Sequence, residues 1–149
     1  MGVKMRKYIY ISLGGIAGAV LRYLIRSLPV NHYAGNIPWN TLVINLTGCF
    51  LLAFVLSAVR DVLRINADLK LGITAGFAGA YTTFSTLCKE TVNLIAKGHY
   101  ISAGLYIILS VLLGIACVYC GVKCSGKAAA IIKKTKKEDT ESNSVSKRR

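Results

Sequence analysis

Four long hydrophobic runs, separated by short polar segments, form the main pattern of the chain. They cover about residues 8–28, 39–59, 71–96 and 100–122. Each run is close to the ~20 residues that an α-helix needs to cross the hydrocarbon core of a bilayer. The pattern therefore predicts an all-α membrane protein in which residues 1–124 form one domain of four transmembrane helices.

The composition and the last part of the chain refine this picture. Hydrophobic residues make up 54% of the sequence and charged residues only 17%, which leaves too little polar surface for a soluble domain of this length. Residues 125–149 are instead rich in Lys, Ser and Glu. Such a segment cannot bury enough apolar surface to fold by itself, so we expect a disordered basic tail there.

The basic residues are distributed unevenly between the two sides of the predicted membrane. Three Lys or Arg precede the first span, three lie between the second and third spans, and nine follow the fourth, whereas only Arg26 and Lys97 fall on the opposite side. Basic residues accumulate on the cytoplasmic side of membrane proteins. We therefore expect both termini in the cytoplasm of a multi-pass protein of the cell membrane. The net charge of +13 is then a topology signal rather than a sign of nucleic-acid binding.

The third hydrophobic run carries an unusual number of hydroxyl groups at its centre. In AGAYTTFSTLCKE, residues 78–90, four of the five positions from 82 to 86 are Ser or Thr, and three glycines come before them. Glycine and β-branched residues weaken a helix, and hydroxyls compete for its backbone groups. These residues predict a break near Gly79–Thr83. Free carbonyls at such a break could hold a cation, and free N–H and O–H groups could meet an anion.

The other runs also contain polar side chains at membrane depth, and each allows two interpretations. Asn45 could be an interhelical hydrogen-bond partner or an N–H donor to an anion. Arg22 could extend to the far interface or serve a functional path. Tyr106 and Ser110 are four residues apart and share one helix face. That face could be a packing seam or one wall of a polar track.

Three segments of the sequence resemble the signature segments of the Fluc/CrcB family of fluoride channels: GGIAGAVLRY (14–23), NTLVINLTG (40–48) and GAYTTFST (79–86). The resemblance extends over all four spans and implies two antiparallel four-helix subunits with two pores and a broken third helix. It implies a structural Na⁺ at the dimer centre, held by the carbonyls of Gly79 and Thr82. The fluoride pathway that it implies here consists of Asn45, Thr83, Phe84, Tyr106 and Ser110, with Arg22 near a vestibule.

The chemistry of fluoride agrees with this set of side chains. A selective pore must replace tightly held water with several N–H and O–H donors, and aromatic ring edges carry partial positive charge. A Lys or Arg at the narrowest point would bind the anion too tightly to release it. The resemblance thus implies a channel, not an enzyme, through which cytoplasmic fluoride leaves the cell passively, lowering its toxicity.

Two features of the sequence depart from the family pattern. Leu87 stands where the family usually has a second Phe, and the strong charge bias favours a single orientation in the membrane. Both departures suggest that this chain pairs with an oppositely oriented homologue that supplies what is missing. The alternative is an antiparallel dimer of this chain with itself.

Three other functions are possible for a protein with these spans. A small multidrug exporter needs an acid within the membrane, and Glu90 is the only acid in any span. A membrane enzyme would need a base near Ser85 or Ser110, but His32 and His99 both fall in predicted loops. A non-transporting membrane subunit could bind anionic lipid through the basic tail, yet that role leaves the hydroxyl cluster unexplained.

Overall fold

The computed structural model describes residues 2–28, 37–61 and 65–146, and within these ranges every regular element is a helix, with no strands. The elements are α1 (Gly2–Ser27), α2 (Trp39–Asp61), α3 (Ala67–Leu71), the π-helix η1 (Gly72–Ala78), α4 (Gly79–Tyr81), α5 (Phe84–Ala96) and α6 (Tyr100–Ser146). The predicted all-α class is therefore confirmed. His32 lies outside the described residues.

Three helices in the described part of the chain are long and apolar enough to cross a membrane. They are Met5–Ser27, Trp39–Arg60 and Tyr100–Ile132, and they correspond to the first, second and fourth predicted spans. The third predicted span, 71–96, is divided among shorter helices. The chain is thus a membrane protein, and its third hydrophobic segment differs in construction from the other three.

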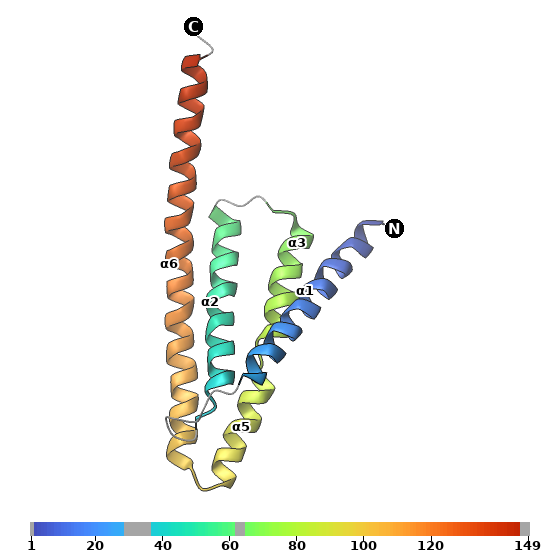
Figure 1. Cartoon of the computed structure of the whole chain (residues 1–149), viewed down its shortest axis with the longest axis vertical. Helices are drawn as coiled ribbons and strands as arrows, with labels where there is room; N and C mark the ends of the chain where they lie inside the picture. The colour runs from blue at the N-terminus through green and yellow to red at the C-terminus, as the bar shows by residue number, and fades with distance from the viewer. Residues whose placement is uncertain (1, 29–36, 62–64, 147–149) are drawn as a thin grey trace.

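The helices are arranged in two pairs, each with its members running in the same direction (Figure 1). In one pair α1 packs on η1, where Gly14 and Gly18 leave no room for a Cβ beside the backbone of Gly72 and Phe77. In the other pair α2 packs on α6, and a Cβ on Gly121 would lie 2.6 Å from the carbonyl oxygen of Phe50. The small residues allow these close helix–helix contacts.

The end of the chain differs from the disordered tail that the sequence led us to expect after residue 124. Helix α6 continues without interruption from Tyr100 to Ser146 (Figure 1). Packing does not stop at residue 124 either, because Ser125 and Ala129 are both buried. The Lys- and Ala-rich sequence of residues 127–138 consists largely of good helix formers, which extend the helix once packing has fixed its preceding turns.

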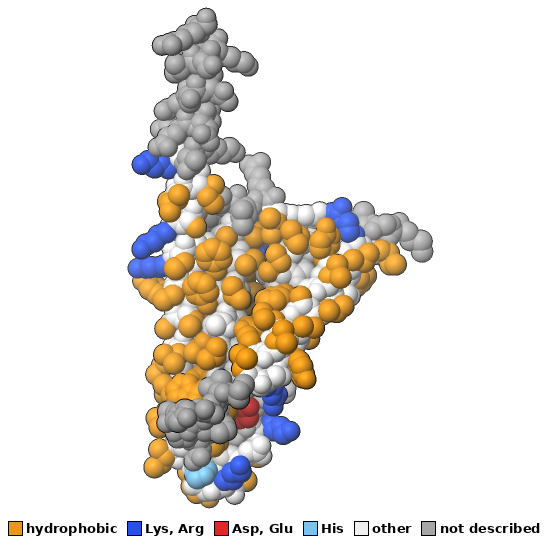
Figure 2. Space-filling model, viewed as in Figure 1, with side chains coloured by type: hydrophobic (Ala, Val, Ile, Leu, Met, Phe, Trp, Pro, Cys, Tyr) orange, Lys and Arg blue, Asp and Glu red, His pale blue; other side chains and the backbone are white. Residues whose placement is uncertain are grey.

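The surface of the molecule is apolar over most of its length. Figure 2 shows hydrophobic side chains covering the visible face of the helices, with Lys and Arg gathered toward the two ends. Ile16 on α1 is 62% exposed and Ile101 on α6 is 81% exposed. A water-soluble protein would not expose so large a continuous apolar surface, whereas lipid tails cover it in a membrane.

Candidate functional site

The third hydrophobic segment changes from helix to extended chain for two residues. Helix α4 ends at Tyr81, and α5 begins at Phe84. Between them Thr82 has φ −75° and ψ 156°, and Thr83 has φ −147° and ψ 114°. Both are ordinary extended conformations for β-branched residues. The interruption lies inside the range Gly79–Thr83 that the glycines and threonines indicated.

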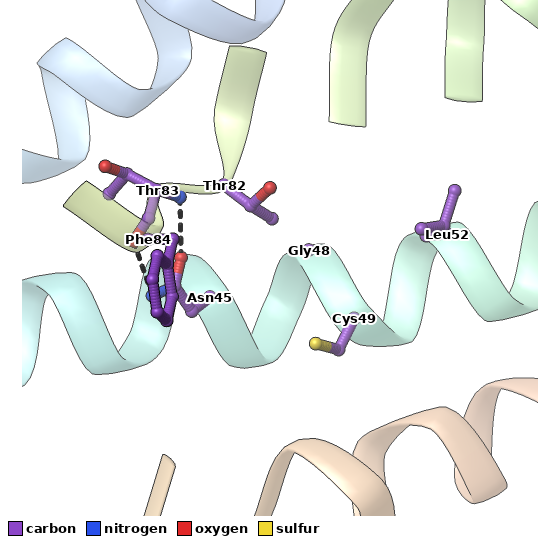
Figure 3. Close-up of a pocket in the computed structure, with 7 residues that line it drawn as sticks. All are labelled: Asn45, Gly48, Cys49, Leu52, Thr82, Thr83 and Phe84. Carbon is purple, nitrogen blue, oxygen red and sulfur yellow. Dashed lines mark hydrogen bonds between the residues drawn. The ribbon is translucent and has the colours of Figure 1, made fainter. Parts of the chain in front are cut away.

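Asn45 of α2 holds this extended stretch in place. Its Nδ2 donates to the carbonyl oxygen of Thr83 at 3.1 Å, and its Oδ1 accepts from the Thr83 N–H at 2.8 Å (Figure 3). The amide side chain therefore pairs with Thr83 as a second backbone strand would, which satisfies both backbone groups of that residue. A second N–H remains on Nδ2, since a primary amide carries two.

The interruption also changes the hydrogen bonding of the carbonyls on its helix side. In a continuous helix, the N–H of Thr83 would donate to Gly79 and that of Thr86 to Thr82. Here the Thr83 N–H donates to Asn45, and the Thr86 N–H donates to Oγ1 of Thr83 at 3.3 Å. The carbonyls of Gly79 and Thr82 thus lose their regular helical donors. These are the two groups that the family resemblance implies as cation ligands.

The hydroxyl groups of the segment have separate roles. Thr82 Oγ1 donates back to the carbonyl of Ala78 at 2.9 Å. Thr83 is the N-cap of α5, and its own hydroxyl donates to Oγ1 of Thr86 at 2.9 Å and lies 3.4 Å from Oγ of Ser85. Thr82 therefore completes the end of one helix, while Thr83 begins the next. This explains why the sequence places hydroxyls on both sides of the interruption.

An open pocket of about 250 Å³ lies between α2 and the interruption. Figure 3 shows Thr83 directly above Asn45, with the ring of Phe84 beside them. Gly48 lets Thr82 approach α2 closely, because a Cβ at Gly48 would overlap the Thr82 methyl group. The lining residues are Asn45, Gly48, Cys49, Leu52, Thr82, Thr83 and Phe84. Three of the predicted pathway residues thus meet at one pocket that contains no charged side chain.

A second polar cluster lies between α5 and the start of α2 and α6. Glu90 accepts a hydrogen bond from Thr41 Oγ1 at 2.9 Å through one carboxylate oxygen and from the Tyr106 hydroxyl at 2.9 Å through the other. Thr41 and Tyr106 are buried, with 1% and 0% of their surfaces exposed. The carboxylate of Glu90 thus has two hydroxyl partners within the same chain, as expected for an acid at membrane depth.

The remaining predicted residues are placed differently. Ser110 donates to the backbone carbonyl of Tyr106 at 2.7 Å. Its hydroxyl therefore bonds within α6 and is not part of the Glu90 cluster. Phe84 is 79% exposed, although its ring borders the pocket. Arg22 is half-buried on α1 and makes no hydrogen bond or ion pair with another residue that the structure describes.

Comparison with known proteins gives these observations a context. The family model described as "CrcB-like protein, Camphor Resistance (CrcB)" matches residues 9–122. The chain belongs to the CrcB-like family. The match extends from α1 into α6 and includes the interruption, the pocket and the Glu90 cluster, whereas the last turns of α6 lie beyond it.

Several relatives of this CrcB-like chain match it over most of their own length. It is 40% identical over 118 residues to the fluoride-specific ion channel FluC of Phocaeicola vulgatus, covering 79% of this chain and 97% of that protein. It is 40% identical over 120 residues to FluC 1 of Staphylococcus aureus strain bovine RF122, covering 80% and 97%. It is 37% identical over 115 residues to FluC 1 of Moorella thermoacetica, covering 77% and 82%.

Leu87, which departs from the usual family sequence, lies against the core of this CrcB-like subunit. It packs on the buried cluster of Leu42, Leu94, Ala103 and Tyr106. The side chain therefore contributes to the packing around this cluster. A Phe at this position would add volume beside the buried cluster, so Leu87 affects the packing of the core as well as the number of aromatic rings.

Proposed function

We propose that this chain is a subunit of a fluoride-selective channel of the cell membrane, through which cytoplasmic fluoride leaves passively. The observation that carries the proposal is the pocket at Asn45 and Thr83. It combines amide and backbone polar groups, a hydroxyl and an aromatic ring without a fixed charge. Relatives that share about 40% of the matched residues are named fluoride-specific ion channels.

In this proposal neutral donors replace the water around the ion. Asn45 can offer its second N–H to an anion while it still holds Thr83. The exposed ring of Phe84 can turn its positive edge toward the pocket. Thr41 and Tyr106 donate their hydroxyls to Glu90, so the neutral donors of the pathway lie at the Asn45 pocket. A neutral pathway binds the anion weakly enough to release it.

The carbonyls of Gly79 and Thr82 support the proposal of a structural Na⁺. Both have lost their regular helical donors, and carbonyl oxygens of unwound helices coordinate Na⁺ in membrane proteins. Gly79 is exposed, and a Cβ there would meet nothing within 4 Å, so a second subunit has room to approach it. One chain supplies only two such carbonyls, and a second copy would supply two more. The bound ion would fix the two interruptions relative to each other.

An antiparallel dimer completes the proposed channel. It would cover Gly79 and Phe84, which a single chain leaves exposed. The partner is either a second copy or an oppositely oriented homologue, and the basic residues favour cytoplasmic termini for this chain. Mapping the termini in cells separates the two: a chain that inserts in both orientations when expressed alone would argue for the homodimer.

The alternative of a small multidrug exporter gains little from the structure. Such an exporter needs an acid that exchanges a proton for a cationic drug. Both carboxylate oxygens of Glu90 are already occupied by hydroxyl donors. The arrangement therefore favours a fixed carboxylate over one that binds and releases a bulky cation.

Growth of fluoride-sensitive bacteria tests the proposed function in cells. Expression of the chain, alone or with an oppositely oriented homologue, should restore growth in fluoride. Asn45→Asp should abolish the rescue, because a negative charge in the pocket repels the anion. Asn143→Ala, a change beyond the family match, is the control and should keep it. Failure of the wild-type chain in both settings, with the protein present in the membrane, would contradict the function.

A further inference from the structure

The part of α6 that passes the end of α2 carries a basic face. Lys123, Lys127 and Lys134 are all exposed. At about 100° per residue their positions lie within about 40° of one another around the helix. Gly121, Ser125 and Ala129 are buried and lie on the opposite side of α6. The three lysines therefore point away from α2, and Figure 2 shows basic side chains projecting from this outer side of α6.

The depth of this face follows from the packing of α6 on α2. Gly121 contacts α2 beside Phe50 and Ala53. Six residues later, about 9 Å along the parallel helices, Lys127 lies level with the last turn of α2, which ends at Asp61. The N-terminal end of α1 lies at the same end of the molecule (Figure 1). This end corresponds to a headgroup layer of the membrane.

An aromatic ring completes the basic face. The Nζ of Lys123 lies 4.8 Å from the centroid of the Tyr119 ring, which is 60% exposed. Tyr is common where a helix leaves the hydrocarbon core, and lysines near a helix end extend their ammonium groups toward the interface. Tyr119 thus orients one ammonium group, and the second follows one helical turn later at Lys127.

We propose that Tyr119, Lys123 and Lys127 form a binding site for the phosphate headgroup of an anionic lipid. The two ammonium groups bind the phosphate, and the tyrosine ring lies at the boundary with the acyl chains. Lys134 is about 16 Å from Lys123 along the helix and adds longer-range attraction. A lipid fits this face better than a soluble anion because the site opens outward at headgroup depth. The site does not depend on ion conduction.

Electron paramagnetic resonance of spin-labelled lipids tests the proposal with the full chain in phosphatidylcholine membranes. The label is carried by either phosphatidylglycerol or phosphatidylcholine, and the fraction of motionally restricted lipid gives their relative association. We expect phosphatidylglycerol to be favoured by about threefold. Lys123→Gln/Lys127→Gln should bring this ratio close to one. The restricted fraction of phosphatidylcholine should stay unchanged, which shows that the variant is folded.

Lys136→Gln/Lys137→Gln is the matched control, because it removes the same charge from the same helix outside the proposed site. This variant should retain most of the preference for phosphatidylglycerol. Equal losses in the two double variants would contradict the site and indicate diffuse attraction by the basic tail. Equal restriction of the two lipids by the wild-type chain would also overturn the proposal. Fluoride efflux plays no part in this readout, so its outcome is independent of the proposed channel function.

Discussion

Asn45 and Thr83 exchange two hydrogen bonds, one from the amide of Asn45 to the Thr83 carbonyl and one from the Thr83 N–H to the amide oxygen. They are 38 residues apart in the sequence and belong to different hydrophobic segments. A side chain of α2 thus takes over the backbone pairing that a helix would otherwise supply. The shape of the third segment depends on the second.

The first prediction concerns removal of this amide. Asn45→Ala leaves the carbonyl and N–H of Thr83 without their partner, which should destabilise the protein by about 1–3 kcal/mol. Fluoride efflux should fall about 10- to 100-fold, because the anion loses a donor and the interruption loses its support. Efflux from liposomes and thermal unfolding in detergent measure the two effects. Asn143→Ala is the control and should change neither efflux nor stability. Wild-type efflux from the Asn45→Ala variant would show that Asn45 is not part of the fluoride pathway.

The second prediction concerns the close approach at Gly48. A Cβ there overlaps the methyl group of Thr82, so Gly48→Ala should displace the interruption from α2 and lower both the melting temperature and efflux. Gly126→Ala is the matched control, because a Cβ at Gly126 meets nothing within 4 Å. That change should be neutral or slightly stabilising, since Ala favours a helix by about 1 kcal/mol. Equal melting temperatures for the two variants would show that the approach at Gly48 is not required.

The third prediction concerns the cluster around Glu90. Glu90→Ala leaves the buried hydroxyls of Thr41 and Tyr106 without an acceptor and should cost about 2–3 kcal/mol. Tyr106→Phe removes one hydroxyl and keeps the ring, so it should cost about 1.5–3 kcal/mol. In the double variant the two costs should overlap by about 1 kcal/mol, because they share one hydrogen bond.

Chemical unfolding of the two single variants and the double variant measures this overlap. Glu138→Ala, which removes an acid beyond the family match, is the control and should leave stability unchanged. If the costs of Glu90→Ala and Tyr106→Phe were simply additive, the hydrogen bond between these residues would contribute nothing to the fold.

The fourth prediction separates the role of Phe84 from packing. Phe84 is 79% exposed in the single chain, so Phe84→Leu should cost the subunit little stability. The loss of the ring edge should still reduce efflux about tenfold. Val92→Ala on the same helix, at a side chain 62% exposed, is the control for apolar surface and should retain efflux. Equal efflux for Phe84→Leu and wild type would show that the ring does not contact the ion.

Much of the fold could be predicted from the sequence because hydrophobic length is a strong signal in membrane proteins. Three apolar runs correspond to α1, α2 and α6. The remaining run, 71–96, contains the glycines and hydroxyls that mark the interruption, whose position depends on the local chemistry of Thr82 and Thr83. The extent of α6 was not predictable in the same way, since the burial of Ser125 and Ala129 depends on packing against another helix.

The polar residues of the candidate site could be predicted from the sequence, but the hydrogen bonds that join them could not. Residues that share a helix, such as Tyr106 and Ser110, can be grouped by their spacing. The contacts of Glu90 with Thr41 and Tyr106 join three elements, and helical spacing carries no information on such contacts. The same applies to Leu87, which differs from the family pattern in the sequence and which the structure places against the buried core cluster.

Fluoride efflux from liposomes tests the central claim most directly. The purified chain is reconstituted alone and together with an oppositely oriented homologue, and released fluoride is read with an ion-selective electrode. The account predicts rapid fluoride efflux in at least one of these preparations while chloride is retained, and loss of that efflux with Asn45→Ala. Intact protein that releases no fluoride in either preparation, or that releases chloride equally fast, would contradict a fluoride-selective channel.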